Sequence, residues 1–90
     1  MFYVYIIRSI SSPVQTYIGF SEDVHSRLIK HNKGDCPHTS KYLPWELEFY
    51  CAFKTKKNAL DFETYLKSHS GKAFAAKRLL PNYSQHSEIS

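Results

Sequence analysis

Three side chains that could act together on a phosphate group lie between residues 16 and 34. Tyr17 provides a phenol, Arg27 a guanidinium and His31 an imidazole. A guanidinium binds the oxygens of an anion through paired N–H donors, and a phenol or an imidazole can take up or pass on a proton. No carboxylate is expected on the same side of the segment as Arg27. We therefore predict that this arginine binds an anionic ligand.

A strand followed by a short helix should position these groups. In a strand over residues 14–20, Tyr17 and Gly19 share one face because strand side chains alternate. The helix is expected over residues 22–33, with Ser21 as its N-cap. The phenol and the helical side chains should then converge where the strand meets the helix.

The expected helix should turn one side toward the body of the protein. Val24, Leu28 and His31 follow the i, i+4, i+7 spacing of a buried face. Arg27 stands three residues after the first of these and four before the last, which predicts that it lies on the same inward side. The residues expected to end the helix are Asn32 and Gly34.

The rest of the chain predicts a small α/β fold of the order β-β-α-β-α-α, with a three-stranded, mainly antiparallel sheet flanked by helices. Residues 2–7 are β-branched and aromatic without polar alternation, which is typical of a central strand covered on both faces. Residues 14–20 should return antiparallel to it. Residues 45–53 alternate with period two and should form a half-buried edge strand. Its expected inward side chains are Trp45, Leu47, Phe49, Cys51 and Phe53.

Two helices are expected in the C-terminal half. The first runs from a cap at Thr55 to about Ser68, with an apolar stripe that contains Glu63. A carboxylate on a buried helix face is costly unless it is paired, protonated or bound to a metal, so Glu63 is a candidate site residue. The last helix is expected over 72–80, after a break at Ser70-Gly71, and its expected packing residues are Phe74, Leu79 and Leu80.

The composition indicates one domain, expected over residues 1–80 and followed by a polar tail over 81–90. Twelve Lys and Arg against eight Asp and Glu give a net charge of +4, a mild indication of a polyanionic partner. Two cysteines form no disulfide framework and favour a reducing, cytoplasmic location. Neither a membrane span nor a signal peptide is expected.

Two short motifs resemble those of the GIY-YIG nuclease superfamily. Tyr3-Val4-Tyr5 is followed about a dozen residues later by Tyr17-Ile18-Gly19. Arg27 and Glu63 stand where that family keeps its arginine and its metal-binding glutamate. The resemblance covers roughly residues 2–80 and is to the small stand-alone bacterial members. The chain also resembles the nuclease domain that acts in bacterial excision repair.

The chain departs from the family pattern at four places. Tyr3 replaces the first-motif glycine, Phe20 replaces a lysine that often follows the second motif, and His31 stands where some relatives have tyrosine. An asparagine that closes the site in some members has no match before Asn82 in the expected tail.

The resemblance implies metal-dependent hydrolysis of DNA phosphodiester bonds, at branched or damaged structures. It implies one divalent metal, Mg²⁺ or Mn²⁺, held by Glu63 and water molecules. Arg27 would bind a non-bridging phosphate oxygen, and Tyr17 would act as the general base. Tyr5 would share the proton or position the phenol, and His31 is the alternative base.

Other interpretations of the same residues stay open on sequence alone. Tyr5 and Tyr17 could be core aromatics, Arg27 and Glu63 a structural ion pair, and His31 a helix-end residue stabilised by the helix dipole. The chain could also be a nucleic-acid-binding module that does not cut, or a scaffold whose charge only solubilises it.

The expected partners are DNA, with RNA as a further candidate, and a protein that supplies target specificity. Contacts to the phosphate backbone are predicted from a set of cations interleaved with an aromatic residue. These residues are Lys41, Tyr42, Lys67, Lys72, Lys77 and Arg78.

Overall fold

The central strand organises the fold, which we describe over residues 1–80 of a computed structural model. The elements are β1 (Phe2–Ser9), β2 (Thr16–Ser21), α1 (Val24–Asn32), the short 3₁₀ helix η1 (Ser40–Tyr42), β3 (Trp45–Phe53), α2 (Lys56–Lys67) and α3 (His69–Arg78). Both outer strands pair antiparallel with β1, in the order β2-β1-β3. The predicted α/β fold with the first strand central is confirmed.

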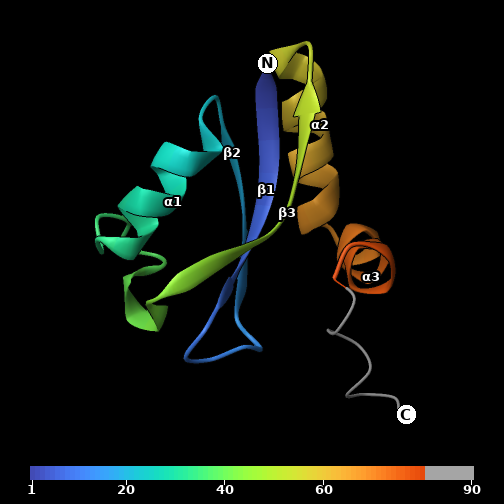
Figure 1. The fold of residues 1–90 in the computed structure, drawn as a ribbon. Helices are drawn as coiled ribbons and strands as arrows, with labels where there is room; N and C mark the ends of the chain where they lie inside the picture. The colour runs from blue at the N-terminus through green and yellow to red at the C-terminus, as the bar shows by residue number, and fades with distance from the viewer. Residues whose placement is uncertain (81–90) are drawn as a thin grey trace.

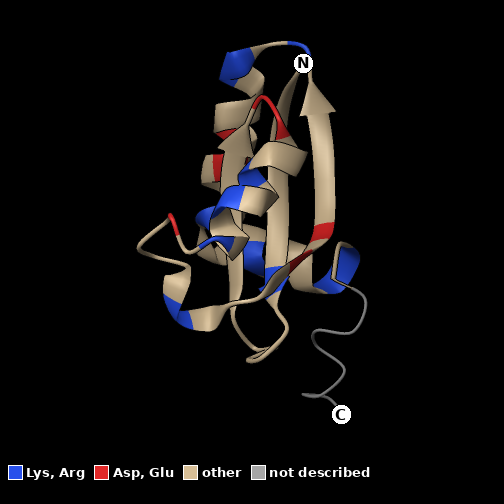
Figure 2. Cartoon of the chain, turned by 60° about the vertical axis from the view of Figure 1, so that its left-hand side comes forward, with Lys and Arg blue, Asp and Glu red and all other residues tan. Residues whose placement is uncertain are grey.

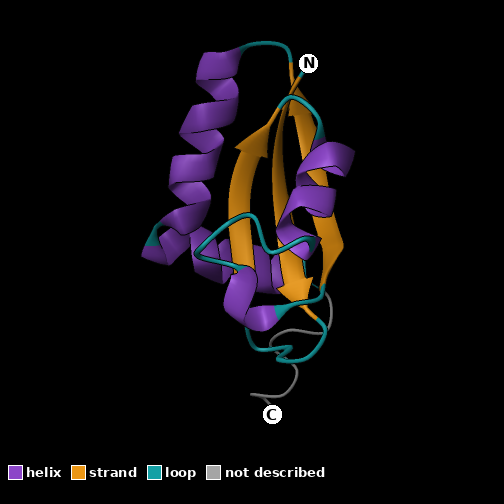
Figure 3. Cartoon of the chain, turned by 90° about the vertical axis from the view of Figure 1, so that its left-hand side faces the viewer, coloured by secondary structure: helices purple, strands orange, loops and turns teal. Residues whose placement is uncertain are grey.

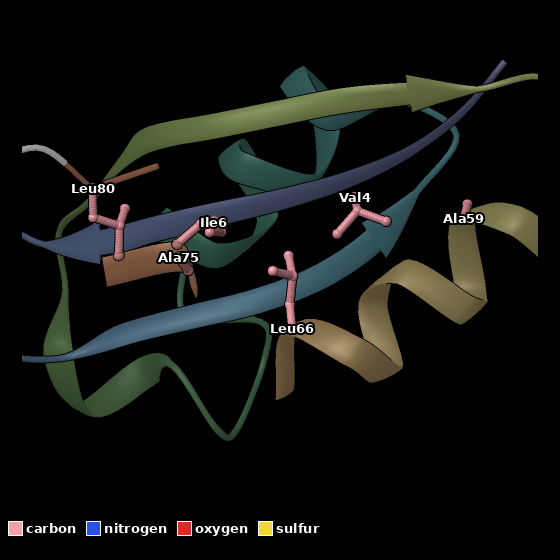
Figure 4. Packing of buried hydrophobic residues seen from close by; sticks show 6 residues of the cluster. All are labelled: Val4, Ile6, Ala59, Leu66, Ala75 and Leu80. Carbon is pink, nitrogen blue, oxygen red and sulfur yellow. The ribbon is translucent and has the colours of Figure 1, made fainter. Parts of the chain in front are cut away.

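Helices cover both faces of the sheet, with α1 on one side and α2 and α3 on the other (Figure 1). Because side chains alternate along β1, Val4 and Ile6 point toward α2 and α3. They are fully buried there against Ala59 and Leu66 of α2, as Figure 4 shows. This first core explains why residues 2–7 carry no polar alternation.

The second core lies on the α1 side and contains the candidate site. Tyr5 and Ile7 of β1 and Trp45 of β3 are buried there, with Val24 and Leu28 of α1 packed against them. The inward stripe predicted for α1 is thus confirmed for these two aliphatic residues.

The third strand does not have the single inward face that its alternation predicted. The register slips between Ile6, which is opposite Phe49, and Ile7, which is opposite Leu47, so Glu48 is an extra residue. Such a bulge turns the side chains beyond it to the other face. Trp45 therefore packs in the second core, whereas Phe49, Cys51 and Phe53 pack against the first. Leu47 is exposed.

The helix α1 begins at Val24, two residues later than predicted, and Asp23 is its N-cap in place of Ser21. The Asp23 carboxylate accepts a hydrogen bond from the Ser26 N–H. Ser21 instead shapes the turn before the helix, since its hydroxyl accepts from the N–H of Asp23. Gly34, with φ of +81°, follows the C-terminal end of the helix as predicted.

The boundary between α2 and α3 also differs from the prediction. Ser68 caps α3 by accepting from the N–H of Gly71, so Ser70 and Gly71 lie inside this helix and do not break the chain. A Cβ atom at Gly71 would collide with the carbonyl of Tyr65 at the end of α2. A glycine lets the two helices approach this closely.

Two of the three packing residues expected for the last helix contact the core, and Phe74 does not. Phe74 is exposed, and its ring meets that of Tyr65 on α2. Leu80 is buried in the first core and Leu79 packs against it, as expected, whereas Ala75 is buried there in place of Phe74. The tail predicted for residues 81–90 lies outside the described part of the chain.

Among residues 1–80, no helix combines the length and the apolar character that crossing a membrane requires. Both cysteines, Cys36 and Cys51, carry free thiols.

The close approach of α2 and α3 at Gly71 predicts that an alanine substitution there destabilises the protein, the opposite of its usual effect in a helix. At an ordinary helical position, Gly→Ala stabilises by about 1 kcal/mol. We expect Gly71→Ala to destabilise by about 1–3 kcal/mol, as overpacked cores do, because the backbone of α2 must shift. Urea unfolding should show this as a lower midpoint with an unchanged slope, and exposed Ser70→Ala serves as the control. A stabilised Gly71→Ala protein would contradict the packing described here.

Candidate active site

A buried hydrogen bond joins the central strand to the end of α1. The Tyr5 hydroxyl lies 2.9 Å from Nε2 of His31, and the two residues are 2% and 1% exposed. The rings meet nearly edge to face, with centroids 5.9 Å apart. Tyr5 is thus part of the core, but its hydroxyl bonds to an imidazole and not to a backbone carbonyl.

The other imidazole nitrogen is also bonded, which fixes the direction of the chain of hydrogen bonds. Nδ1 of His31 lies 2.8 Å from the Thr39 hydroxyl, and that hydroxyl donates to the carbonyl of Cys36 at 3.3 Å. Because the threonine proton is used on Cys36, Nδ1 is the protonated nitrogen and donates to Thr39. Nε2 then accepts from the Tyr5 hydroxyl.

Gly19 makes room for the Tyr5 phenol. The two residues are direct partners in the β1–β2 ladder, and a Cβ atom at Gly19 would collide with the hydroxyl end of the Tyr5 ring. Tyr17, two residues earlier on the same face of β2, packs its ring against both Tyr5 and His31, with centroids 6.5 Å and 5.1 Å away. The predicted shared face of Tyr17 and Gly19 is confirmed.

Arg27 is exposed, so its predicted inward orientation is wrong. At 100° per residue, Arg27 falls about 60° to the side of the stripe formed by Val24, Leu28 and His31. This places the guanidinium at the rim, still close enough to act electrostatically on Tyr5 and His31.

Glu63 lies on α2 and pairs with Lys67, one turn later on the same helix, at 3.2 Å. The alternative of a structural pair between Glu63 and Arg27 is therefore wrong. The Glu63 side chain is 18% exposed, so it is partly buried as the sequence predicted, while the Lys67 side chain extends into solvent.

A metal bound here would have few protein ligands. Residues 1–80 contain no group of three or more His, Cys, Asp or Glu side chains that could hold a metal ion. The partly buried carboxylate of Glu63 fits Mg²⁺ or Mn²⁺, hard cations that bind one or two carboxylates and keep several water molecules.

Groups from four parts of the chain act electrostatically on the Tyr5 hydroxyl. Burial is the main cause that raises the pKa of Tyr5 well above its usual value, and the Tyr17 phenol adds to it. The Arg27 guanidinium opposes this shift, whereas Cys36 and Glu63 raise the pKa further. Tyr17 on β2, Arg27 on α1 and Glu63 on α2 are therefore all within electrostatic reach of one phenol.

Burial also lowers the pKa of His31, and the nearby Arg27 charge lowers it further. The imidazole is neutral at pH 7, which does not fit the interpretation of a charged histidine stabilised by the helix dipole.

The site opens at the edge of the sheet. In Figure 3, β2 lies between α1 on the right and α2 on the left, and in the sheet of residues 1–80 it pairs only with β1. Lys and Arg residues lie on α1 and on α3, on opposite sides of the sheet (Figure 2).

The six residues predicted to contact the phosphate backbone do not form one surface. Lys41 is exposed on η1, next to Tyr42, whose ring packs against Trp45 in the second core. Lys67 and Lys72 line one cavity beside β2. Lys77 and Arg78 are exposed in the last turn of α3.

Two residues that hold the site in place were not recognised from the sequence. Thr39, which is 1% exposed, bonds to His31, and its carbonyl accepts from the indole N–H of Trp45. Asn32, predicted only to end α1, bridges to both the N–H and the carbonyl of Trp45. Thr39 lies in an irregular segment and Asn32 at the last position of α1, so neither carries a periodic signal that would reveal such contacts.

The paired motifs on β1 and β2 match a known sequence pattern. The profile of the GIY-YIG catalytic domain matches residues 1–78. The chain belongs to the GIY-YIG family. In this family's terms, the first motif, Tyr3-Val4-Tyr5, and the second motif, Tyr17-Ile18-Gly19, pair as antiparallel strands with Tyr5 opposite Gly19.

Relatives of this GIY-YIG chain include both short and long proteins. It is 33% identical over 69 residues to a UPF0213 protein of Staphylococcus saprophyticus, covering 76% of this chain and 82% of that protein. It is 37% identical over 65 residues to a structure-specific endonuclease subunit SLX1 homolog of Giardia intestinalis, covering 68% of this chain but only 18% of that protein.

A solved structure shares the GIY-YIG fold described here. The solution NMR structure of a UPF0213 protein from Bacillus halodurans superposes with a TM-score of 0.54 at 28% identity, covering 100% of this chain and 98% of the other. The asparagine that some family members use could correspond only to Asn82, which lies outside the described residues.

The depressed pKa of His31 predicts a loss of stability in mild acid. Unfolded histidine takes up a proton below about pH 6.5, whereas buried His31 resists it, so stability is full above that pH and falls as the pH decreases. We expect the melting temperature to fall from pH 7 to pH 5, and His31→Gln to remove most of this dependence. His25→Gln, on the exposed side of α1, should retain it. Equal pH dependence in wild type and His31→Gln would exclude a buried neutral imidazole.

Proposed function

We propose that this chain is a divalent-metal-dependent endonuclease that hydrolyses DNA phosphodiester bonds at branched or damaged structures. The supporting observation is that Tyr17, Arg27 and Glu63, from three different elements, all act electrostatically on the buried Tyr5 phenol, with the Tyr17 ring packed against it. The name of the Giardia relative, a structure-specific endonuclease subunit, supports the same class of reaction.

Arg27 binds the phosphate in this proposal. Its exposed guanidinium can reach a phosphodiester without desolvating a buried charge, and paired N–H donors suit two phosphoryl oxygens. As negative charge develops on those oxygens in the transition state, a fixed positive charge stabilises it.

Tyr17 is the group that accepts or orients the proton of the attacking water. Its ring is half-buried in an edge strand, next to Tyr5 and His31. His31 is less suited to contact water because it is buried and both of its nitrogens are bonded within the protein. Tyr5 and His31 are therefore assigned as positioning residues that hold the Tyr17 ring from two sides.

Glu63 holds the metal. When bound, a divalent cation neutralises charge on the phosphoryl oxygens, and Mg²⁺ and Mn²⁺ both fit a site with one carboxylate. The Lys67 ammonium, now paired with Glu63, has to yield part of that contact to the metal.

A partner protein that selects the target is also part of this proposal, because the Giardia relative is named as a subunit. The free thiols of Cys36 and Cys51 support action in the reducing cytoplasm.

Removal of the Arg27 side chain should impair DNA cleavage but leave the stability of the fold unchanged. We expect Arg27→Ala to lower the cleavage rate of branched DNA by about 10²–10³, with little change in melting temperature because the side chain is exposed. The measurement is a gel assay with flapped, nicked and duplex DNA in Mg²⁺, Mn²⁺ or EDTA. Lys30→Ala, one turn along α1, is the matched control for lost charge.

The same assay distinguishes an enzyme from a binding module. DNA binding that weakens with added salt, together with no cutting in either metal by the wild type, would replace the nuclease proposal with a non-cutting module. Binding that ignores salt would contradict both.

Metal binding should require the Glu63 carboxylate, and the loss of another negative charge on α2 should not abolish it. We expect millimolar Mn²⁺ to raise the melting temperature of wild type but not that of Glu63→Gln. Without metal, the two should differ by no more than about 0.5 kcal/mol, since i,i+4 ion pairs on helices contribute this little. Asp61→Asn, which breaks a similar pair with Lys57 on the same helix, is the control and should keep the Mn²⁺ response. A response retained in Glu63→Gln would exclude Glu63 as the ligand.

A further inference from the structure

A cavity of about 350 Å³ lies along β2, where the strand meets α2 and α3. This volume is at the lower end of the range for small-ligand sites. Its apolar walls include Ile6, Ile18, Ala75 and Leu80, which belong to or pack against the first core. The wall is thus held rigidly by buried residues.

The polar lining of this cavity carries positive charge. Lys67 and Lys72 both line it, and among residues 1–80 no acidic residue does. Lys72 is exposed, so its ammonium can approach a ligand without a desolvation cost. Edge strand β2 also directs backbone N–H and C=O groups away from β1. An anionic group with an apolar, hydrogen-bonding body matches this lining.

The cavity is next to the candidate active site. Tyr17 lines it and also packs against Tyr5 and His31. Lys67 lines it as well and is paired with Glu63, the proposed metal ligand. Because Tyr17 and Lys67 belong to both, a DNA strand that contacts Tyr17 at the edge of β2 would pass close to the cavity.

We infer that this cavity binds one unpaired nucleotide next to the scissile phosphate, with Lys72 on its phosphate and the apolar wall against its sugar and base. The inferred ligand is a single nucleotide, so the substrate class is DNA with an unpaired nucleotide adjoining the cut, such as a flap or a frayed end. This inference rests on the proposed nuclease function for its role, but the binding itself is tested separately.

Binding is tested by NMR titration of the ¹⁵N-labelled full chain with thymidine 5′-monophosphate, deoxyribose 5-phosphate and thymidine. We expect the monophosphate to shift amide signals of residues 15–18 and of Lys72 and Ala75. Each of the other two ligands lacks one half of the predicted contacts, and should bind at least about fivefold more weakly.

Matched variants distinguish binding at this cavity from nonspecific attraction to the positively charged protein. Lys72→Gln should raise the Kd for the monophosphate at least about fivefold. Lys56→Gln, with the same charge change at the far end of α2, should change it less than twofold. Thr16→Phe, at a half-buried edge-strand position lining the cavity, should block binding while the spectrum stays dispersed. Equal effects of Lys72→Gln and Lys56→Gln, or equal binding of deoxyribose 5-phosphate, would overturn the inference.

A cleavage assay then tests the role of the base. A flap substrate with an abasic unit next to the cut should be cleaved at least about fivefold more slowly than the intact flap. Equal cleavage of the two would overturn the inference while leaving the nuclease proposal intact. If no DNA is cut but the titration gives the expected shifts, the nuclease proposal fails and the nucleotide site stands.

Discussion

The hydrogen bond from the Tyr5 hydroxyl to Nε2 of His31 is the contact on which the site depends. It fixes the end of α1 against the central strand in the buried interior, where an unpaired hydroxyl or imidazole would be costly. Thr39 extends the bond into the segment after α1, and the Trp45 indole ties that segment to β3. The glycine at position 19 follows from the same contact, because the phenol occupies the space above it.

The location of the site at a sheet edge explains how so small a domain can offer several functional groups. A strand paired on one side only can be flanked by a helix from each face of the sheet. Here Arg27 comes from α1 and Glu63 from α2, with Tyr17 on β2 between them. The pair of Tyr5 and His31 is buried, and the positioning role proposed for it requires no exposure.

Much of this arrangement could be predicted from the sequence, because periodicity and motif spacing carry it. The unbroken apolar run of residues 2–7 indicated the central strand, and the alternation of Tyr17 and Gly19 indicated their shared face. The exposure of Arg27 follows from its place about 60° to the side of the stripe on α1, and the N-cap of that helix is Asp23. Ser21 and Asp23 are both good caps, so local preference could not choose between them.

Features that depend on tertiary contacts were not predictable in this way. The role of Thr39 arises from a segment without regular structure, and the helical position of Gly71 from its contact with the end of α2. The glycine was interpreted as a helix breaker because its low helix propensity is a local property. In the folded chain, the packing of two helices overrides that preference.

The extra residue at Glu48 allows one strand to supply side chains to both cores. The number of residues in β3 therefore determines which of its side chains face each of the two cores. A deletion there would turn Phe49, Cys51 and Phe53 away from α2, or else Trp45 away from α1. Related chains should thus accommodate insertions and deletions in the hairpin of residues 10–15, while β3 keeps a constant length.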